Sequence, residues 1–344
     1  MFHDLDPAAL ARRHSVKWSK YGDDVLAAWV ADMDFPIAPP IKRALQAVLD
    51  LDDVGYPGFD LRDAVRTTFV DRMQDRFGWS PEFEQTRLIT TVVQGLHLAL
   101  ELTTEPGDGV VVQPPVYHPF LDAIAQMGRR QVDAPLVHAT AGYTIDIDRF
   151  RDAVAEGARA FMLCNPHNPT GRVFGADELV AMAEVLAGHD CIVIADEIHQ
   201  DLVFPGHHHR VFAEVAPELA TRTITLTSAS KAFNLAGNRC AIVHFGSPDL
   251  LDRFEEKTDR LFGEVSLMGH VSTLAAWRES ESAEWFDEML AYIDGSRRWL
   301  ASALAERLPD AGHVSPEGTY LAWVDLHAYE LGDDPAAMLL QRAK

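Results

Sequence analysis

Residues 225–239 read Thr-Leu-Thr-Ser-Ala-Ser-Lys-Ala-Phe-Asn-Leu-Ala-Gly-Asn-Arg. An apolar, β-branched run leads into two serines and Lys231, and Arg239 follows eight residues later. A lysine just past the carboxyl end of a strand lies where doubly wound α/β folds bind ligands. Ser228 and Ser230 can donate hydrogen bonds to an anion, and an arginine can bind phosphate oxygens with two parallel bonds. A lone lysine is more often a solvated surface residue, so the interpretation of Lys231 as part of a ligand site needs support from other parts of the sequence.

Short apolar runs alternate with segments of helical periodicity around this stretch, between about residues 86 and 246. Several runs are continuously hydrophobic, which is typical of strands buried on both faces. The pattern predicts an α/β fold with a mainly parallel, doubly wound sheet, connected by crossover helices or turns over segments such as 95–103, 176–187 and 198–203. The expected strands cover residues 88–93, 109–112, 160–164, 191–195, 223–227 and 241–245.

The two ends of the chain differ from this central pattern. A Pro-rich stretch at 35–40 leads into an amphipathic helix over 41–49. After the last expected strand, helical patterns dominate until a strand-like run at 318–326. We expect the two ends to pack together as a smaller α+β domain. The predicted division is an N-terminal arm and part of the small domain over 1–50, a large domain over 51–283 and an incomplete C-terminal small domain over 284–344, with helices at 249–262 and 284–308.

Composition argues against two classes of partner. The 344 residues include 52 acidic and 30 basic side chains, which gives a formal net charge of −22. Nucleic-acid binding needs a basic face, and so does most peripheral binding to anionic membranes. The N-terminus lacks the pattern of a signal peptide, and no apolar run approaches the ~18 residues of a membrane-spanning helix. We therefore expect a cytoplasmic protein with neither a nucleic-acid nor a membrane partner.

Cysteine and histidine placement gives no sign of a metal site. The odd number of cysteines and the absence of C-x-x-C spacing favour buried free thiols over disulfides or paired ligands. The histidines at 207–209 follow Phe-Pro-Gly and are expected at an exposed loop tip rather than around a metal. The cysteines are Cys164, Cys191 and Cys240.

Polar segments follow two further expected strands. Asn165-Pro-His-Asn-Pro-Thr-Gly171 comes after 160–164, and Asp196-Glu-Ile-His-Gln-Asp201 comes after 191–195. Carboxyl ends of parallel strands meet at one edge of a sheet, so both segments should face the same crevice as Lys231. Asn168 can also be a simple turn residue and Asp196 a helix N-cap.

These motifs together resemble a known enzyme family. The chain resembles the fold-type-I pyridoxal-phosphate enzymes related to class I and II aminotransferases, most closely their cystathionine β-lyase (cysteine-sulfur lyase) branch. The resemblance covers essentially the whole chain. The broad match rests on Asn168-Pro-Thr-Gly171, Asp196 with His199, Ser228-x-Ser-Lys231 and Arg239. The branch is indicated by Lys17-Trp18, Lys20-Tyr-Gly22, Trp29-Val-Ala-Asp-Met-Asp-Phe35, Gly55-Tyr-Pro57 and Pro114-Pro-Val-Tyr-His-Pro-Phe120.

The resemblance implies pyridoxal 5′-phosphate as the cofactor of the large domain. Lys231 matches the lysine that is linked to the cofactor aldehyde and then serves as base for the substrate Cα proton. Asp196 matches the partner of the pyridine nitrogen, and Tyr117 the aromatic residue stacked on the ring. Asn168 matches the donor to the ring O3′ oxygen. His199 occupies a position that is often a tyrosine in the wider family.

The resemblance also implies how the cofactor phosphate is bound. Gln94, Gly95 and Leu96 lie at an expected strand-to-helix turn, where backbone N–H groups favour an anion. Side-chain donors would come from Ser228, Ser230 and Arg239. Tyr56 matches a tyrosine that reaches the phosphate of the neighbouring subunit, which implies a homodimer.

The substrate entrance and the reaction follow from the branch. Ala31 and Asp32 match the segment that lines the substrate entrance. The alternative for Asp32 is a purely structural role, in which its side chain braces the Pro-rich turn. The expected reaction cleaves cystathionine or a related cysteine S-conjugate to a thiol, pyruvate and ammonia. An aminotransferase on the same scaffold is the alternative.

The substrate-carboxylate arginine of the family has no match in this sequence. In the family this residue lies late in the small domain, and the sequence ends at Gln341-Arg-Ala-Lys344 before that motif. We therefore expect either a sequence that is part of a longer protein or a chain without the usual arginine. The second case motivates another alternative, a cofactor-binding regulatory protein with impaired catalysis.

Overall fold

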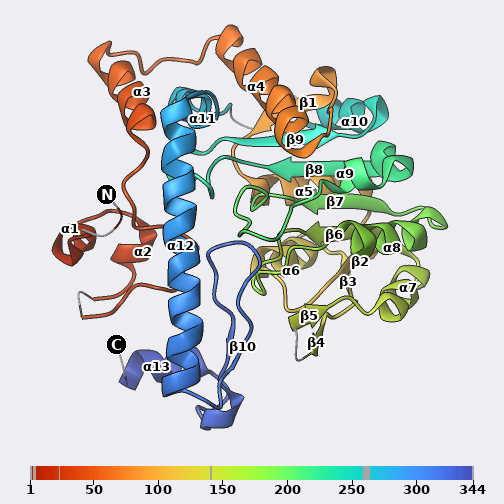
Figure 1. The fold of residues 1–344 in the computed structure, drawn as a ribbon. Coiled ribbons are helices and arrows are strands. Elements are labelled where there is room, and N and C mark those ends of the chain that lie inside the picture. The colour runs from red at the N-terminus through yellow and green to blue at the C-terminus, as the bar shows by residue number, and fades with distance from the viewer. Residues whose placement is uncertain (1, 3–4, 23, 140–141, 259–263, 343–344) are drawn as a thin grey trace.

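The computed structural model describes residues 2, 5–22, 24–139, 142–258 and 264–342. Its centre is a seven-stranded sheet in the order β1-β9-β8-β7-β6-β2-β3 (Figure 1). β9 runs antiparallel to its neighbours and the other pairs run parallel, so the predicted mainly parallel α/β sheet is confirmed. The strands are β1 (Thr86–Ile89), β2 (Gly109–Val112), β3 (Arg130–Asp133), β6 (Ala158–Cys164), β7 (Ile192–Asp196), β8 (Thr223–Thr227) and β9 (Ala241–Phe245).

Two strands differ from the prediction for identifiable reasons. β3 lies at the edge of the sheet and buries only Val132, so it has no apolar run that a sequence pattern could detect. β1 ends at Ile89 rather than at residue 93, because Thr91 begins the next helix, α5 (Val92–Thr103). The Thr91 side chain accepts a hydrogen bond from the backbone N–H of Gln94 at 3.0 Å, which is the N-cap arrangement.

Helices cover both faces of the sheet, and the side-chain alternation of the strands explains why. Along β6, Met162 and Cys164 join one apolar core, while Phe161 and Leu163 join the other. Successive side chains of a strand point to opposite faces, so a continuous apolar run serves both cores. One core receives α5, α6 (His118–Gln126) and α10 (Pro248–Thr258), and the other α7 (Ile147–Ala155), α8 (Ala176–Ala187) and α9 (Phe212–Val215).

The two ends of the chain meet in a third apolar core. Phe35 and Ile41 from the N-terminal part pack with Phe233 and with Trp285 and Met289 of the long helix α12 (Ser280–Arg307). In Figure 1, α12 stands between the helices within residues 7–50 and the sheet. The domain limits at 50 and 283 stay predictions, and the second falls inside α12. The remaining helices are α1 (Pro7–Ala11), α2 (Val16–Ser19), α3 (Pro39–Asp50), α4 (Phe59–Phe77), α11 (Leu267–Arg278) and α13 (Pro335–Arg342).

The expected strand over 318–326 is mostly wrong. Only β11 (Val324–Asp325) forms there, paired with β10 (Gly312–His313), while Gly318 makes an isolated bridge to Val203. Thr319 has a left-handed backbone, with φ at 67°, and this conformation interrupts an extended strand. A small hairpin of β4 (Val137–Ala139) and β5 (Gly142–Thr144) completes the strands that the structure describes.

Four features expected from the composition can be compared with the structure. The cysteines are free and buried, as predicted. His209 is buried rather than exposed, with its Nε2 3.3 Å from Glu197 Oε2, so the loop-tip prediction is wrong for this residue. None of the helices in the described ranges is long and apolar enough to span a bilayer. Within the same ranges, no group of three or more His, Cys, Asp or Glu side chains could hold a metal ion.

Gly246 tests the packing at the end of β9. A Cβ at this position would lie 1.7 Å from the Ala220 carbonyl oxygen, so Gly246→Ala must displace backbone and should lower the free energy of unfolding by about 3 kcal/mol. Gly295, inside α12, has nothing within 4 Å of such a Cβ. Gly295→Ala should instead raise stability by about 1 kcal/mol, because alanine favours helix. Urea denaturation of both variants measures the contrast, and equal effects would contradict this account.

Candidate active site

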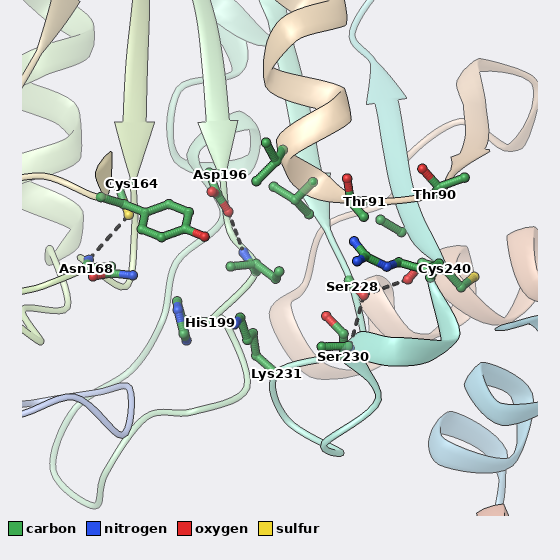
Figure 2. A pocket seen from close by; sticks show the side chains of 17 residues that line it. Thr90, Thr91, Cys164, Asn168, Asp196, His199, Ser228, Ser230, Lys231 and Cys240 are labelled. Carbon is green, nitrogen blue, oxygen red and sulfur yellow. Dashed lines mark hydrogen bonds between the residues drawn. The ribbon is translucent and has the colours of Figure 1, made fainter. Parts of the chain in front are cut away.

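A pocket lies where the carboxyl ends of the central strands meet, and Figure 2 shows its lining side chains. Asp196 is the last residue of β7 and pairs in register with Cys164, the last residue of β6. Ser228 follows β8 directly. Parallel strands therefore deliver these side chains to one edge, as expected for a doubly wound sheet. The pocket brings together predicted site residues Tyr117, Asn168, Asp196, His199, Ser228, Ser230, Lys231 and Arg239.

Lys231 faces the N-terminal segment across the pocket. Its Nζ donates a 2.8 Å hydrogen bond to the carbonyl oxygen of Ala31. Burial lowers the pKa of the Lys231 amine, while the charges of Asp32 and Asp196 oppose that shift. The structure thus brings the predicted entrance residues Ala31 and Asp32 to the predicted reactive lysine.

Asp196 is a buried carboxylate with an incomplete set of partners. Its Oδ1 accepts a 3.1 Å hydrogen bond from the backbone N–H of Ile198, and the residue is 3% exposed. Burial raises the pKa of Asp196 to about 7, against the lowering effects of that hydrogen bond and of Lys231. A cationic N–H donor in the pocket would favour the charged carboxylate.

His199 and Asn168 line the same side of the pocket. The buried Nδ1 of His199 has no hydrogen-bond partner among the described residues. Burial, together with the charge of Lys231, lowers the pKa of His199 to about 3, so its ring is neutral near pH 7. The Asn168 backbone N–H donates to Cys164 Sγ at 3.4 Å, which ties this loop to the end of β6.

The opposite end of the pocket carries hydroxyl and guanidinium groups. Ser228 Oγ donates to the Cys240 carbonyl at 2.6 Å and accepts from the Ser230 backbone N–H at 3.0 Å (Figure 2). Arg239 has φ at 55°, a left-handed conformation that is strained for a residue with a side chain. The Ser228 hydroxyl proton is thus already used, whereas the Ser230 hydroxyl and the Arg239 guanidinium line the pocket and form a polar end that suits an anion.

The predicted backbone donors at Gln94, Gly95 and Leu96 need a correction. The Gln94 N–H is used by the Thr91 side chain, the Gly95 N–H donates to the Thr91 carbonyl at 3.1 Å, and Leu96 is buried in the sheet core. The pocket is lined instead by Val92 and Val93, in the first turn of α5, where helix amides have no intrahelical partner.

A local signal for this helix start was present in the sequence. Thr91-Val-Val-Gln94 has the spacing of a capping box. The Gln94 side-chain oxygen accepts from the Thr90 backbone N–H at 2.9 Å, one residue earlier than the usual box. The apolar, β-branched Val92 and Val93 are typical of a strand, so the sequence pattern favoured a strand over the start of a helix.

Tyr56 lies outside the pocket formed by one chain. Its side chain is 96% exposed and borders a separate hollow, together with Val54, Val265 and Met268. Leu51, Val54 and Phe59 are also exposed apolar residues of this segment. The expected contact between Tyr56 and a neighbouring subunit stays a prediction.

Comparison with known proteins identifies the family. The family model for aminotransferase class I and II matches residues 31–343. The chain belongs to the aminotransferase class I and II family. The resemblance inferred from the motifs is therefore confirmed.

Relatives within this family place the chain near one branch. It is 36% identical to "Cystathionine beta-lyase PatB" of Bacillus subtilis over 93% of this chain and 83% of that protein. The PLP-bound C-S lyase from Staphylococcus hominis aligns with a TM-score of 0.90 at 31% identity, over 96% of this chain and 86% of that one. Cystalysin from Treponema denticola, which contains pyridoxal 5′-phosphate, aligns with a TM-score of 0.88 at 31% identity, over 95% and 84%.

The raised pKa of Asp196 predicts that the free energy of unfolding of this protein, without a bound cofactor, depends on pH. Between about pH 4 and pH 7 the folded chain holds a proton that the unfolded chain releases, so stability should fall as the pH rises. Asp196→Asn removes this loss while keeping an acceptor for Ile198. The variant should be more stable than wild type at pH 8, and its advantage should shrink toward pH 4.5.

Urea denaturation at the two pH values measures this difference. Asp122→Asn is the control, because Asp122 is exposed on α6. A gain from Asp196→Asn that is equal at both pH values would show that burial of charge at Asp196 does not cause the effect.

Proposed function

We propose that this chain is a pyridoxal-phosphate-dependent carbon–sulfur β-lyase that cleaves cystathionine or related cysteine S-conjugates to a thiol, pyruvate and ammonia. The observation that carries the proposal is the shared pocket of Lys231 and Asp196 in a chain whose relatives are named cystathionine β-lyase and C-S lyase. Family membership supports the cofactor class, and the names of the relatives support the reaction.

The residues of the pocket fit this cofactor in charge and in hydrogen bonding. Among the described residues, the Asp196 carboxylate accepts one backbone hydrogen bond and is acted on by the charge of Lys231, and a protonated pyridine nitrogen would supply it with a direct cationic partner. The buried Nδ1 of His199 has no hydrogen-bond partner among the described residues, so it is available to a bound ligand. At the other end, Ser230 and Arg239, with the first amides of α5, suit a phosphate group.

When bound, the cofactor withdraws electrons from the substrate Cα, which favours loss of the Cα proton and of the β-thiolate. Lys231 would take that proton at Nζ. Burial favours the neutral amine, the form that can act as a base. Asp196 would keep the ring nitrogen protonated, Tyr117 would lie against the ring, and Asn168 would orient it through its side-chain amide.

The amino-acid substrate would enter beside Ala31 and Asp32. The Ala31 carbonyl already holds Lys231 Nζ in the ligand-free pocket. A substrate that displaces the lysine therefore returns the amine to an existing acceptor. Lys231 would then remain hydrogen-bonded beside the pocket rather than be released to solvent.

An aminotransferase is the second candidate, favoured by the description of the matching family model. The two reactions share binding and removal of the Cα proton. They differ in whether the β-substituent leaves or the amino group is retained for transfer to a 2-oxo acid. The pocket residues serve both, so the products decide.

Incubation of the purified protein with cystathionine tests the proposed reaction. We expect release of thiol, pyruvate and ammonia without an added 2-oxo acid. Lys231→Ala should abolish turnover and the visible absorbance of the lysine-linked cofactor. Lys257→Ala is the matched control, because that exposed lysine pairs with Glu101 far from the pocket, and it should retain both.

Other outcomes point to the alternatives. Amino transfer to an added 2-oxo acid without thiol release identifies an aminotransferase. Cofactor binding without either reaction supports the regulatory alternative. Absorbance that persists in Lys231→Ala without added amine contradicts the assignment of the lysine.

We also propose that the enzyme is a homodimer in which Tyr56 serves the neighbouring active site. The exposed Leu51, Val54, Tyr56 and Phe59 support an interface, because clustered apolar side chains on a surface gain by being covered. The acidic net charge supports neither a nucleic-acid partner nor an anionic membrane partner.

Val54→Glu tests the interface. A charge buried against a second copy is costly, so the variant should sediment as a monomer and bind the cofactor more weakly. Leu339→Glu, at an exposed leucine of α13, is the control and should sediment with the same mass as the wild-type protein. A wild-type protein that sediments as a monomer would refute the shared site.

A further inference from the structure

Residues 31–35, which we call the strap, contact Lys231 and are held in place by donors from distant parts of the chain. Asn234, just beyond the reactive lysine, donates from Nδ2 to two strap carbonyls at 3.0 Å each. Lys17 Nζ donates to a third strap carbonyl at 2.8 Å and forms a 2.7 Å ion pair with Asp34. Trp18 Nε1 donates to the other oxygen of that carboxylate at 2.8 Å. The strap is therefore fixed beside Lys231, which lines the pocket.

The first carbonyl of the strap has two side-chain donors. The Ala31 oxygen accepts from Lys231 Nζ at 2.8 Å and from the Tyr320 hydroxyl at 3.1 Å. A carbonyl oxygen has two lone pairs and can accept both bonds at once. Tyr320 reaches this oxygen from a segment 289 residues away along the chain.

The backbone around Tyr320 fixes the direction of its side chain. Thr319 is fully buried in a left-handed conformation, and its N–H donates to the Leu202 carbonyl at 2.7 Å. The Gly318 N–H donates to the Gly171 carbonyl at 2.9 Å. The Tyr320 ring lies edge-on to His199, with 6.0 Å between ring centroids. Tyr320 is thus anchored to both loops that carry predicted cofactor contacts.

We propose that Tyr320 is a positioning residue for the reactive lysine, because its hydroxyl shares the Ala31 carbonyl with Lys231. The inference rests on the proposed function, in which Lys231 leaves this carbonyl to bond the cofactor and returns when substrate displaces it. Tyr320 keeps the carbonyl hydrogen-bonded during the absence of the lysine. It also weakens the hold of the carbonyl on the lysine, since one acceptor serves two donors.

The hydroxyl keeps its proton over the working pH range. Burial raises the pKa of Tyr320, and the charges of Asp32 and Tyr117 raise it further. Groups that face the Lys231 amine are Asp32 from the strap, Asp196 from β7 and the neutral His199. Tyr320→Phe changes none of these charges. Any effect of the substitution on the amine therefore comes through the shared carbonyl.

Tyr320→Phe should leave Lys231 as the one side-chain donor to the Ala31 carbonyl among the residues that the structure describes. The ammonium form is then held more firmly and the pKa of the amine rises. The rate at which the cofactor-free, full-length protein takes up pyridoxal 5′-phosphate reports the neutral amine. We expect the midpoint of its pH profile to move up by about 0.5 to 1 unit, which is about three- to tenfold slower uptake below the midpoint.

Tyr143→Phe is the matched control. Its hydroxyl also takes part in a hydrogen bond, accepting from Trp323 Nε1 at 2.9 Å, but its partner is this indole rather than the Ala31 carbonyl. Its midpoint should equal that of the wild type. A folded Tyr320→Phe with an unshifted midpoint would overturn the inference. Failure of the wild type to take up the cofactor would instead count against the proposed function.

A second substitution covers the case in which Tyr320→Phe does not fold. Site-specific 3-fluorotyrosine at position 320 keeps the ring and makes the hydroxyl a stronger donor. The carbonyl is then less available to Lys231, so the uptake midpoint should move to lower pH. A midpoint equal to that of the wild type would again overturn the inference.

Discussion

Burial of opposite charges in one pocket is the constraint on which the site depends. Burial raises the pKa of Asp196 and lowers that of Lys231, so each group is pushed toward its neutral form. A ligand with a cationic ring nitrogen and an aldehyde that bonds an amine satisfies both groups. The fold thus builds a site that is better satisfied with its cofactor than without it.

The scaffold for this site comes from the middle of the chain and its closure from the ends. Strands β6, β7 and β8 place Cys164, Asp196 and Ser228 at one edge of the sheet. The strap arrives from the N-terminal part and Tyr320 from the C-terminal part, and both meet at the Ala31 carbonyl. Segments from the middle and from both ends of the chain therefore meet at Lys231 and are joined by a few hydrogen bonds.

The loop that carries Asn168 is connected to the C-terminal part by ionic contacts. Arg172 pairs with Glu317 at 2.9 Å and with Glu178 of α8 at 2.8 Å. A Cβ on Gly171 would lie 2.3 Å from Pro316, so the loop and the C-terminal segment approach as closely as backbone allows. A rigid attachment of this kind keeps the pocket wall in place while the lysine moves between partners.

The sequence by itself determined the buried sheet and the chemistry at its edge. Continuous apolar runs identify strands covered on both faces. The polar residues that follow 160–164 and 191–195 lie at one edge of the sheet, because parallel strands share one direction and their carboxyl ends meet there. The edge strand β3 could not be predicted because it buries only Val132. The start of α5 was predicted as strand because Val92 and Val93 are β-branched and apolar. Only the tertiary structure placed Tyr320 and Lys231 on the same carbonyl. Every residue carries a backbone carbonyl, so an acceptor of this kind has no sequence signature, and a contact across 289 residues exists only once the chain has folded.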